Sequence, residues 1–169
     1  MSTQLNSFIL PDEIVKKMKD KIRESRLKMR EEGFSLCRSQ NNNILKIGNE
    51  CEGTKCKIER PSQTCKEKED EYKGLFHTHP SGNINPSIDD LYGMYRDGLG
   101  CIGSPKGDKI KCFIRKDPKI DINILGRLQH AYDPLATVYH KLPKEDFDRL
   151  YDAVIGYLTN ENFNATDVK

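Results

Sequence analysis

The segment Gly74–His79 constrains the fold more than any other part of the chain. It reads Gly-Leu-Phe-His-Thr-His and is followed by Pro80. The apolar residues after the glycine predict a short buried strand, and along a strand the side chains of residues i and i+2 point to the same face. We therefore expect His77 and His79 to lie side by side. Pro80 should end the strand, because it has no N–H to donate to a neighbour.

The residues after this strand supply a third polar side chain. Residues 81–86 are rich in Ser, Gly, Asn and Pro, which predicts a turn. A helix is expected to begin at Ser87 and to run to about Tyr95, with Asp90 in its first turn, where the carboxylate can swing back towards the imidazoles. Two histidines and an aspartate give zinc three protein ligands and leave its fourth position for water, whose pKa the metal lowers towards about 7. The sequence therefore predicts a hydrolytic zinc site on His77, His79 and Asp90.

A zinc hydrolase also needs a general base near the metal. Glu32 is the preferred candidate, because a strand that starts there places its side chain on the same face as Phe34 and Leu36, and so inward. A buried carboxylate is costly without a partner, and a metal-coordinated water would supply one. Glu31 is the competing candidate. The alternative for Glu32 is the last exposed position of a preceding helix.

The other parts of the motif have plainer interpretations as well. A His-x-His pair also occurs on ordinary strand surfaces. Ser87 with Asp90 three residues later is a good helix N-cap with an acidic residue in the first turn. A cap and a metal site can share residues, so these two interpretations of Ser87 and Asp90 are compatible.

Taken together, the motif resembles the signature of the JAMM metalloproteases of the MPN domain, in which a distant Glu precedes His-Ser/Thr-His-Pro and then Ser and Asp at this spacing. The resemblance covers about residues 10–116, and Glu32-x-x-Ser35-x-x-x-Ser39 is similar to the family's Glu-x-x-small-x-x-x-small strand. It implies an α/β (α+β) fold that is MPN/JAB-like (cytidine-deaminase-like), with a mixed sheet flanked by helices. The implied roles are zinc binding by His77, His79 and Asp90, water activation by Glu32, and oxyanion stabilisation by Ser87.

The activity implied by this resemblance is that of a zinc-dependent isopeptidase or peptidase. Its substrate would be the bond after the C-terminal glycine of ubiquitin or a ubiquitin-like modifier. One alternative is a JAMM-type peptidase that processes a ubiquitin-like sulfur-carrier protein. Another is a non-catalytic MPN scaffold that binds a partner protein, although such scaffolds typically lack the metal ligands. Some family members need an accessory protein subunit, which is a further candidate partner.

Length and charge indicate one compact domain over residues 1–160. With 28 Lys and Arg against 26 Asp and Glu, the chain lacks the excess positive charge of a nucleic-acid binder. No apolar run approaches the roughly 18 residues of a membrane span, and the N-terminus has no signal-peptide pattern, so we expect a cytoplasmic protein with neither nucleic acid nor membrane as a partner. The polar residues 161–169 are expected to form a frayed tail.

The expected cytoplasmic location determines how the six cysteines are interpreted. In a cytosolic chain the thiols are expected to stay reduced, so Cys37, Cys101 and Cys112, which lie in apolar runs, are interpreted as small core residues. Cys51, Cys56 and Cys65 lie in a polar stretch and leave three alternatives: free thiols, a disulfide or a second metal site.

Periodicity predicts the remaining elements. A helix should begin at Pro11–Glu13, with an apolar stripe of Ile14, Met18, Ile22 and Met29. Strands are expected over Glu32–Ser39, Ile44–Gly48, residues 55–60, Leu99–Gly103 and Lys109–Arg115. In the helical C-terminal third, Asp133-Pro134 predicts one helix start and Pro143 the next. The apolar face of that last helix should pack on the sheet; it comprises Phe147, Leu150, Tyr151, Val154, Ile155 and Leu158.

Overall fold

The computed structural model describes residues 2–56 and 64–169. Its centre is a six-stranded mixed sheet in the order β4-β3-β5-β6-β7-β8, in which β5 and β6 are parallel and the other neighbours are antiparallel. The strands of this sheet are β3 (Glu32–Arg38), β4 (Leu45–Glu52), β5 (Glu71–Thr78), β6 (Leu99–Ser104), β7 (Lys109–Arg115) and β8 (Phe163–Val168). A separate hairpin joins β1 (Ser2–Leu5) to β2 (Phe8–Pro11).

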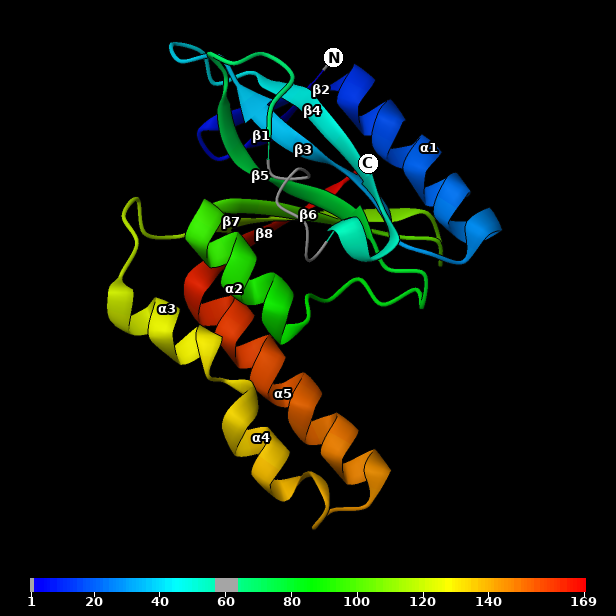
Figure 1. The fold of residues 1–169 in the computed structure, drawn as a ribbon, viewed down its shortest axis with the longest axis vertical. Helices are drawn as coiled ribbons and strands as arrows, with labels where there is room; N and C mark the ends of the chain where they lie inside the picture. Colours follow the sequence, from blue (N-terminus) through cyan, green and yellow to red (C-terminus); the bar gives the residue numbers. More distant parts are fainter. Residues whose placement is uncertain (1, 57–63) are drawn as a thin grey trace.

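Helices cover both faces of the sheet (Figure 1). One face carries α1 (Asp12–Lys28), and the other carries α2 (Ile88–Asp97), which makes the crossover between the parallel strands β5 and β6. The C-terminal helices α3 (Ile122–Gln129), α4 (Tyr132–Tyr139) and α5 (Lys144–Asn162) follow on the α2 side, where α4 and α5 extend away from the sheet as a pair. A 3-10 turn, η1 (Gly53–Cys56), follows β4.

Strand alternation divides the interior into two cores. On the α1 face, Phe34 and Phe76 are fully buried and their rings lie 5.1 Å apart. On the α2 face, Ile102 and Phe113 are buried beneath the helices. Because β3 and β5 are covered on both sides, burial alone does not say which way one of their side chains points.

The predicted mixed α/β sheet flanked by helices is confirmed, and most predicted elements lie where expected. The starts of α1 and α5 and the spans of β6 and β7 agree to within one or two residues. Met29 is an exception: it is the left-handed C-cap of α1, with φ 56° and 76 % exposure, so it lies outside the buried stripe.

The fourth helix begins at Tyr132 with Ala131 as N-cap, so Asp133 and Pro134 lie inside its first turn. Cys56 ends the 3-10 turn, which contradicts the start of the strand predicted at 55–60; residues 57–63 lie outside the described part.

The predicted frayed tail at 161–169 is wrong. After α5 the chain forms β8, which pairs antiparallel with β7 along its whole length, from Phe163 opposite Arg115 to Val168 opposite Ile110. Only the two end residues of β8 are buried. The strand therefore depends on main-chain hydrogen bonds, which leave little trace in the apolar pattern of the sequence.

The expectation of reduced thiols is also wrong. The structure pairs the cysteines as Cys37–Cys65, Cys51–Cys56 and Cys101–Cys112. Disulfides are typical of oxidising compartments and of some hyperthermophilic intracellular proteins. None of the helices in the described part is long and apolar enough to cross a membrane.

Candidate metal centre

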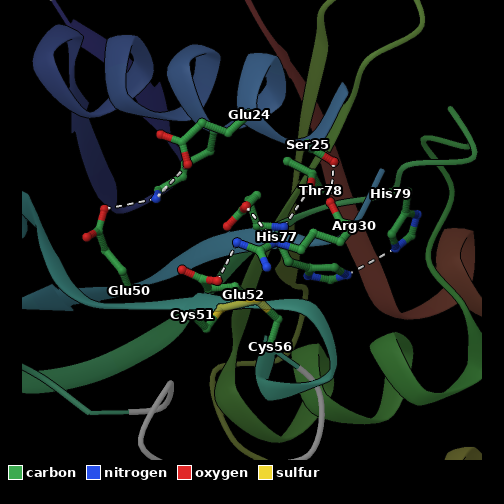
Figure 2. Close-up of a disulfide and its surroundings, with 12 residues drawn as sticks. Glu24, Ser25, Arg30, Glu50, Cys51, Glu52, Cys56, His77, Thr78 and His79 are labelled. Atoms are coloured by element: carbon green, nitrogen blue, oxygen red, sulfur yellow. Dashed lines mark hydrogen bonds and ion pairs between the residues drawn. A yellow bond between two sulfur atoms is a disulfide. The ribbon is translucent and has the colours of Figure 1, made fainter. Parts of the chain in front are cut away.

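The two predicted histidines meet at the end of β5. His77 lies in the strand opposite Gly33, and the backbone N–H of His79 donates to the Gly103 carbonyl at 2.9 Å, which continues the strand geometry past Thr78. Their Nε2 atoms lie 3.0 Å apart, and both side chains are buried. Figure 2 shows the two rings side by side with this contact marked. The alternation predicted from the sequence is therefore confirmed.

Asp90 reaches the same point from the first turn of α2. A capping box holds it there: the Asp90 N–H donates to the Ser87 hydroxyl at 3.1 Å, and the Ser87 N–H donates to Oδ2 of Asp90 at 2.9 Å. The other contacts of the carboxylate are with the imidazoles. Oδ1 lies 3.2 Å from His77 Nε2, and Oδ2 lies 3.0 Å from His79 Nε2. The helix cap and the cluster thus share Asp90.

These three side chains fit a metal ion. Ligand atoms about 2.0–2.1 Å from a tetrahedral zinc lie about 3.3 Å from one another. The two Nε2 atoms lie 3.0 Å apart, and each lies 3.0–3.2 Å from a different oxygen of the Asp90 carboxylate, which is close to that value. Two imidazoles and one carboxylate are also the donor set of catalytic zinc sites with one open position.

The hydrogen bonding of His79 supports the same conclusion. Its Nδ1 lies 2.8 Å from the Asn83 carbonyl oxygen, which can only accept, so Nδ1 carries the proton. In a neutral ring Nε2 then presents a lone pair, and this lone pair faces Oδ2 of Asp90. Two such acceptors repel one another unless a proton or a metal cation lies between them. A second hydrogen bond that fixes the tautomer is typical of histidine ligands.

The electrostatics of Asp90 agree with a site for positive charge. Burial of the carboxyl group opposes its ionisation. The positive charge and hydrogen bonds of His77 and His79, when their Nε2 atoms carry protons, outweigh that penalty and hold the pKa of Asp90 well below its usual range. The carboxylate is therefore ionised at neutral pH, as a metal ligand must be.

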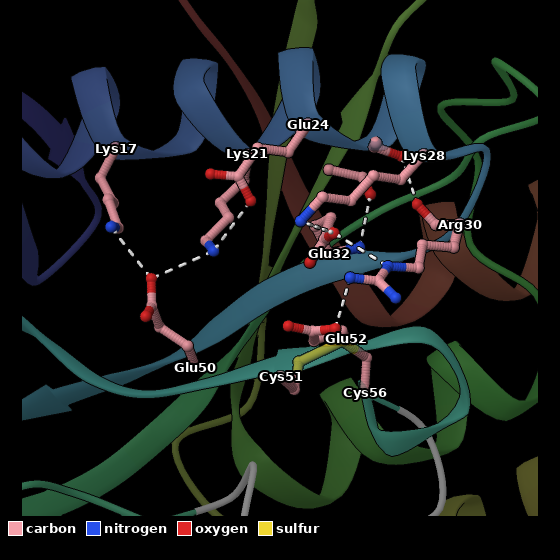
Figure 3. Close-up of polar contacts among 12 residues, drawn as sticks. Lys17, Lys21, Glu24, Lys28, Arg30, Glu32, Glu50, Cys51, Glu52 and Cys56 are labelled. Carbon is pink, nitrogen blue, oxygen red and sulfur yellow. Dashed lines mark hydrogen bonds and ion pairs between the residues drawn. A yellow bond between two sulfur atoms is a disulfide. The ribbon is translucent and has the colours of Figure 1, made fainter.

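The structure does not bring Glu32 to this cluster. Glu32 is buried, as predicted, but it shares the α1 face of the sheet with Phe34, whereas His77 points to the α2 face. Its Oε1 lies 3.2 Å from Arg30 Nε and 3.6 Å from Lys28 Nζ (Figure 3). Its backbone N–H donates to Thr78 Oγ1 at 2.9 Å. This geometry places Glu32 away from the cluster at which it is expected from the sequence. The sheet has a core on each face, so a buried side chain of β3 can point to either core.

Glu31 is the glutamate that lies at the cluster. With His77 and His79 it forms a group that could hold a metal ion, because one carboxylate oxygen and one nitrogen of each ring all lie within 4.8 Å of one another. It precedes β3, and its carbonyl accepts from the Gly53 N–H at 2.6 Å. Strand alternation in the sequence shows that Glu31 and Glu32 face opposite sides of the sheet, but it does not show which side carries His77.

Ser87 and Glu31 border one cleft. A cavity of about 260 Å³ is lined by Glu31, His79 and Ser87, among others. A separate, narrower cavity of about 70 Å³ reaches His77 and Asp90 from the other side, between β5 and α2. The candidate metal centre therefore borders two cavities, and Ser87 and Glu31 line the larger one.

A disulfide supports the segment around Glu31. Cys51 pairs with Gly33 across β3 and β4, and its bond to Cys56 closes η1. The same turn contains Gly53, which donates to the Glu31 carbonyl. Figure 2 shows this disulfide beside Arg30 and His77. Cys56 also lines the narrow cavity.

Comparison with known proteins adds no assignment to this geometry. The chain matches no protein-family model and no curated protein.

Proposed function

We propose that the protein is a zinc-dependent isopeptidase or peptidase of the JAMM type, which hydrolyses the bond after the C-terminal glycine of ubiquitin or a ubiquitin-like modifier. The observation that carries the proposal is the convergence of His77, His79 and Asp90 within 3.2 Å of one another. A glutamate and a serine beside them supply the two other groups that such a hydrolase needs.

His77, His79 and Asp90 would hold the zinc. When bound, zinc polarises the substrate carbonyl and makes a coordinated water more acidic. Glu31 takes a proton from the attacking water and passes it to the leaving amine as the C–N bond breaks. The water oxygen ends on the new carboxylate, so the products are a free carboxyl terminus and an amine.

Ser87 has a hydroxyl suited to the oxyanion. One lone pair of its Oγ accepts the Asp90 N–H of the helix cap, and the hydroxyl proton remains to be donated. A preorganised donor at this position stabilises the negative charge that develops on the carbonyl oxygen. The capping bond helps to fix the direction of the hydroxyl.

The narrow cavity beside His77 favours small acyl residues. Leu75, Gly93 and Met94 line it, and its volume is only about 70 Å³. An extended chain that ends in glycine fits such a passage better than one with large side chains. A sulfur-carrier protein of ubiquitin-like shape would use the same site, so it is a second substrate for the test.

The test combines metal content with cleavage. The purified chain should bind about one zinc and cleave lysine-linked conjugates or C-terminal extensions of one such modifier, and a chelator should stop the cleavage. His77→Ala should lose both zinc and activity. His130→Ala, which removes an exposed histidine at the end of α3, should keep both. Cleavage that continues in the presence of the chelator would contradict the mechanism. Wild-type protein that binds no zinc would favour the alternative of a non-catalytic scaffold that binds a partner protein.

A further inference from the structure

The cleft at the candidate metal centre continues along the C-terminal helix. Beyond the cavity that contains Glu31 and Ser87, a second cavity of about 240 Å³ lies between the 83–86 loop, α5 and the β7–β8 pair. The two cavities share the lining residues Asn83, Asn85, Pro86 and Tyr151, so they adjoin one another; together they are called the groove. Their combined size reaches the range of sites that hold peptide segments or small ligands, about 300–1,000 Å³.

The chemistry of the second cavity is that of a peptide site. Asn85 and Asn160 line it with amide groups, which can both donate to and accept from a peptide backbone. Phe113 and Ile155 also line it and are buried, so its base is apolar. One lysine and one aspartate, Lys111 and Asp152, balance in charge. This lining suits an extended, uncharged stretch of polypeptide better than a nucleic acid or an anionic ligand.

The position of Glu31 decides which half of the substrate lies there. In the proposed reaction Glu31 gives its proton to the leaving amine, so the leaving group must lie on the Glu31 side. Glu31 and Ser87 line the groove, whereas the narrow cavity beyond His77 is lined by neither. The modifier's glycine end therefore belongs in the narrow cavity, and the part released as the amine belongs in the groove.

We propose that this groove is a leaving-group subsite for an extended polypeptide segment and that Tyr151 of α5 is a specificity-determining residue. The proposal rests on the proposed function. It adds that the enzyme prefers a modifier joined to a peptide chain over one joined to a small amine. Tyr151 lines the groove along its length, and its hydroxyl accepts the Ile88 N–H at 3.4 Å, which links α5 to the helix that bears Asp90.

Gly156 allows the groove to be filled without disturbing the metal site. It lies in α5 and lines the second cavity, and a Cβ added there meets nothing within 4 Å. Gly156→Phe should therefore fold and project a ring into the groove. Gly126 in α3 is a matched control, because an added Cβ there also meets nothing within 4 Å and Gly126 is not among the lining residues of the groove.

The experiment uses two substrates made from ubiquitin or, where ubiquitin is not cleaved, from the ubiquitin-like modifier that the cleavage test above shows to be a substrate. One carries a six-residue peptide after its C-terminal glycine, and the other carries only a small fluorogenic amine. Wild-type protein should have the higher kcat/KM for the peptide form. Gly156→Phe should raise KM for that form about tenfold or more with kcat little changed, and leave the small-amine form within about twofold of wild type. Gly126→Phe should leave both forms unchanged.

Tyr151→Ala gives a second measure of the subsite. It should reduce the preference for the peptide form, while Tyr157→Ala, on the exposed side of the same helix, should not. Equal kcat/KM values for the two wild-type substrates, or an unchanged KM in Gly156→Phe, would overturn the subsite and leave the proposed function intact. Failure of wild-type protein to cleave either form would overturn both.

Discussion

The two faces of the sheet use adjacent glutamates for different purposes. On the α1 face Glu32 is 1 % exposed and is paired with Arg30 and Lys28, in a core of aliphatic and aromatic side chains. On the other side Glu31 lies beside two imidazoles at the edge of a cleft. The comparison teaches that a step of one residue exchanges a structural carboxylate for one that can take part in chemistry.

The largest expected effect separates these two glutamates. Glu31→Gln should lower kcat by about 10²–10⁴-fold, because it removes the group that we propose moves the proton, while zinc content stays near one per chain. Glu32→Gln should keep kcat within a few-fold and lower the free energy of unfolding by about 1–3 kcal/mol, because it removes a buried charge-assisted hydrogen bond. Turnover, metal analysis and denaturant unfolding measure the three quantities.

The opposite result would exchange the roles of general base and structural carboxylate between Glu31 and Glu32. If Glu32→Gln abolishes turnover without unfolding the protein, the base is the residue suggested by the sequence motif. If Glu31→Gln loses zinc as well as activity, Glu31 is a ligand in place of, or together with, Asp90.

The next effect concerns helix caps on the α2 side. Ser87→Ala should lower kcat by about 10²–10³-fold through loss of the proposed oxyanion donor and destabilise α2 by about 1 kcal/mol. Asp121→Ala removes the N-cap of α3, where the Asp121 side chain accepts from the N–H groups of Asn123 and Ile124. It should lower the free energy of unfolding about as much as Ser87→Ala does, without affecting kcat. Equal losses of activity in the two variants would mean that Ser87 acts only as a cap.

The sequence specified the candidate ligands better than the candidate base. His77, His79 and Asp90 follow from local rules, since a two-residue repeat, a proline stop and a helix cap each fix geometry over a few residues. The choice between Glu31 and Glu32 depends on which side chains of β3 lie on the same face of the sheet as His77. That is set by the pairing of β3 with β5, in which Gly33 lies opposite His77, 44 residues further along the chain. β8 and the groove at Tyr151 could not be predicted for the same reason, because both arise where the C-terminal helix returns to the sheet.

The disulfides also differ between the two faces: one lies in the core on the α1 face, and another supports the segment that carries Glu31. Cys101 and Cys112 are directly opposite in β6 and β7 within the α1-face core, so the double alanine variant should lose about 2–3 kcal/mol of stability and keep its kcat. The Cys51–Cys56 disulfide closes a shorter loop, so its double alanine variant should lose about 2 kcal/mol of the free energy of unfolding. Its kcat should also fall about ten- to hundredfold, because Glu31 loses a support. Unchanged kcat in the second variant would show that η1 does not position Glu31.

The smallest expected effect lies where α1 meets β4. Glu50 lies 2.9 Å from the Lys17 ammonium and 3.1 Å from that of Lys21 (Figure 3). The bond from Lys17, helped by Lys21 and opposed by partial desolvation, lowers the pKa of Glu50 from its ordinary 4.5. A lowered pKa in the folded state adds stability above the unfolded value, and that stability is lost as pH falls through the folded value.

Glu50→Gln should therefore lower the free energy of unfolding at pH 7 by less than about 1 kcal/mol, because Glu50 is half exposed and solvent screens the pairs. The difference from wild type should shrink as pH drops below 4.5 and should also shrink in high salt. Denaturant unfolding at pH 7 and pH 3, each with and without added salt, measures it. A difference that persists at pH 3 would mean that Glu50 stabilises this junction by packing and not by charge.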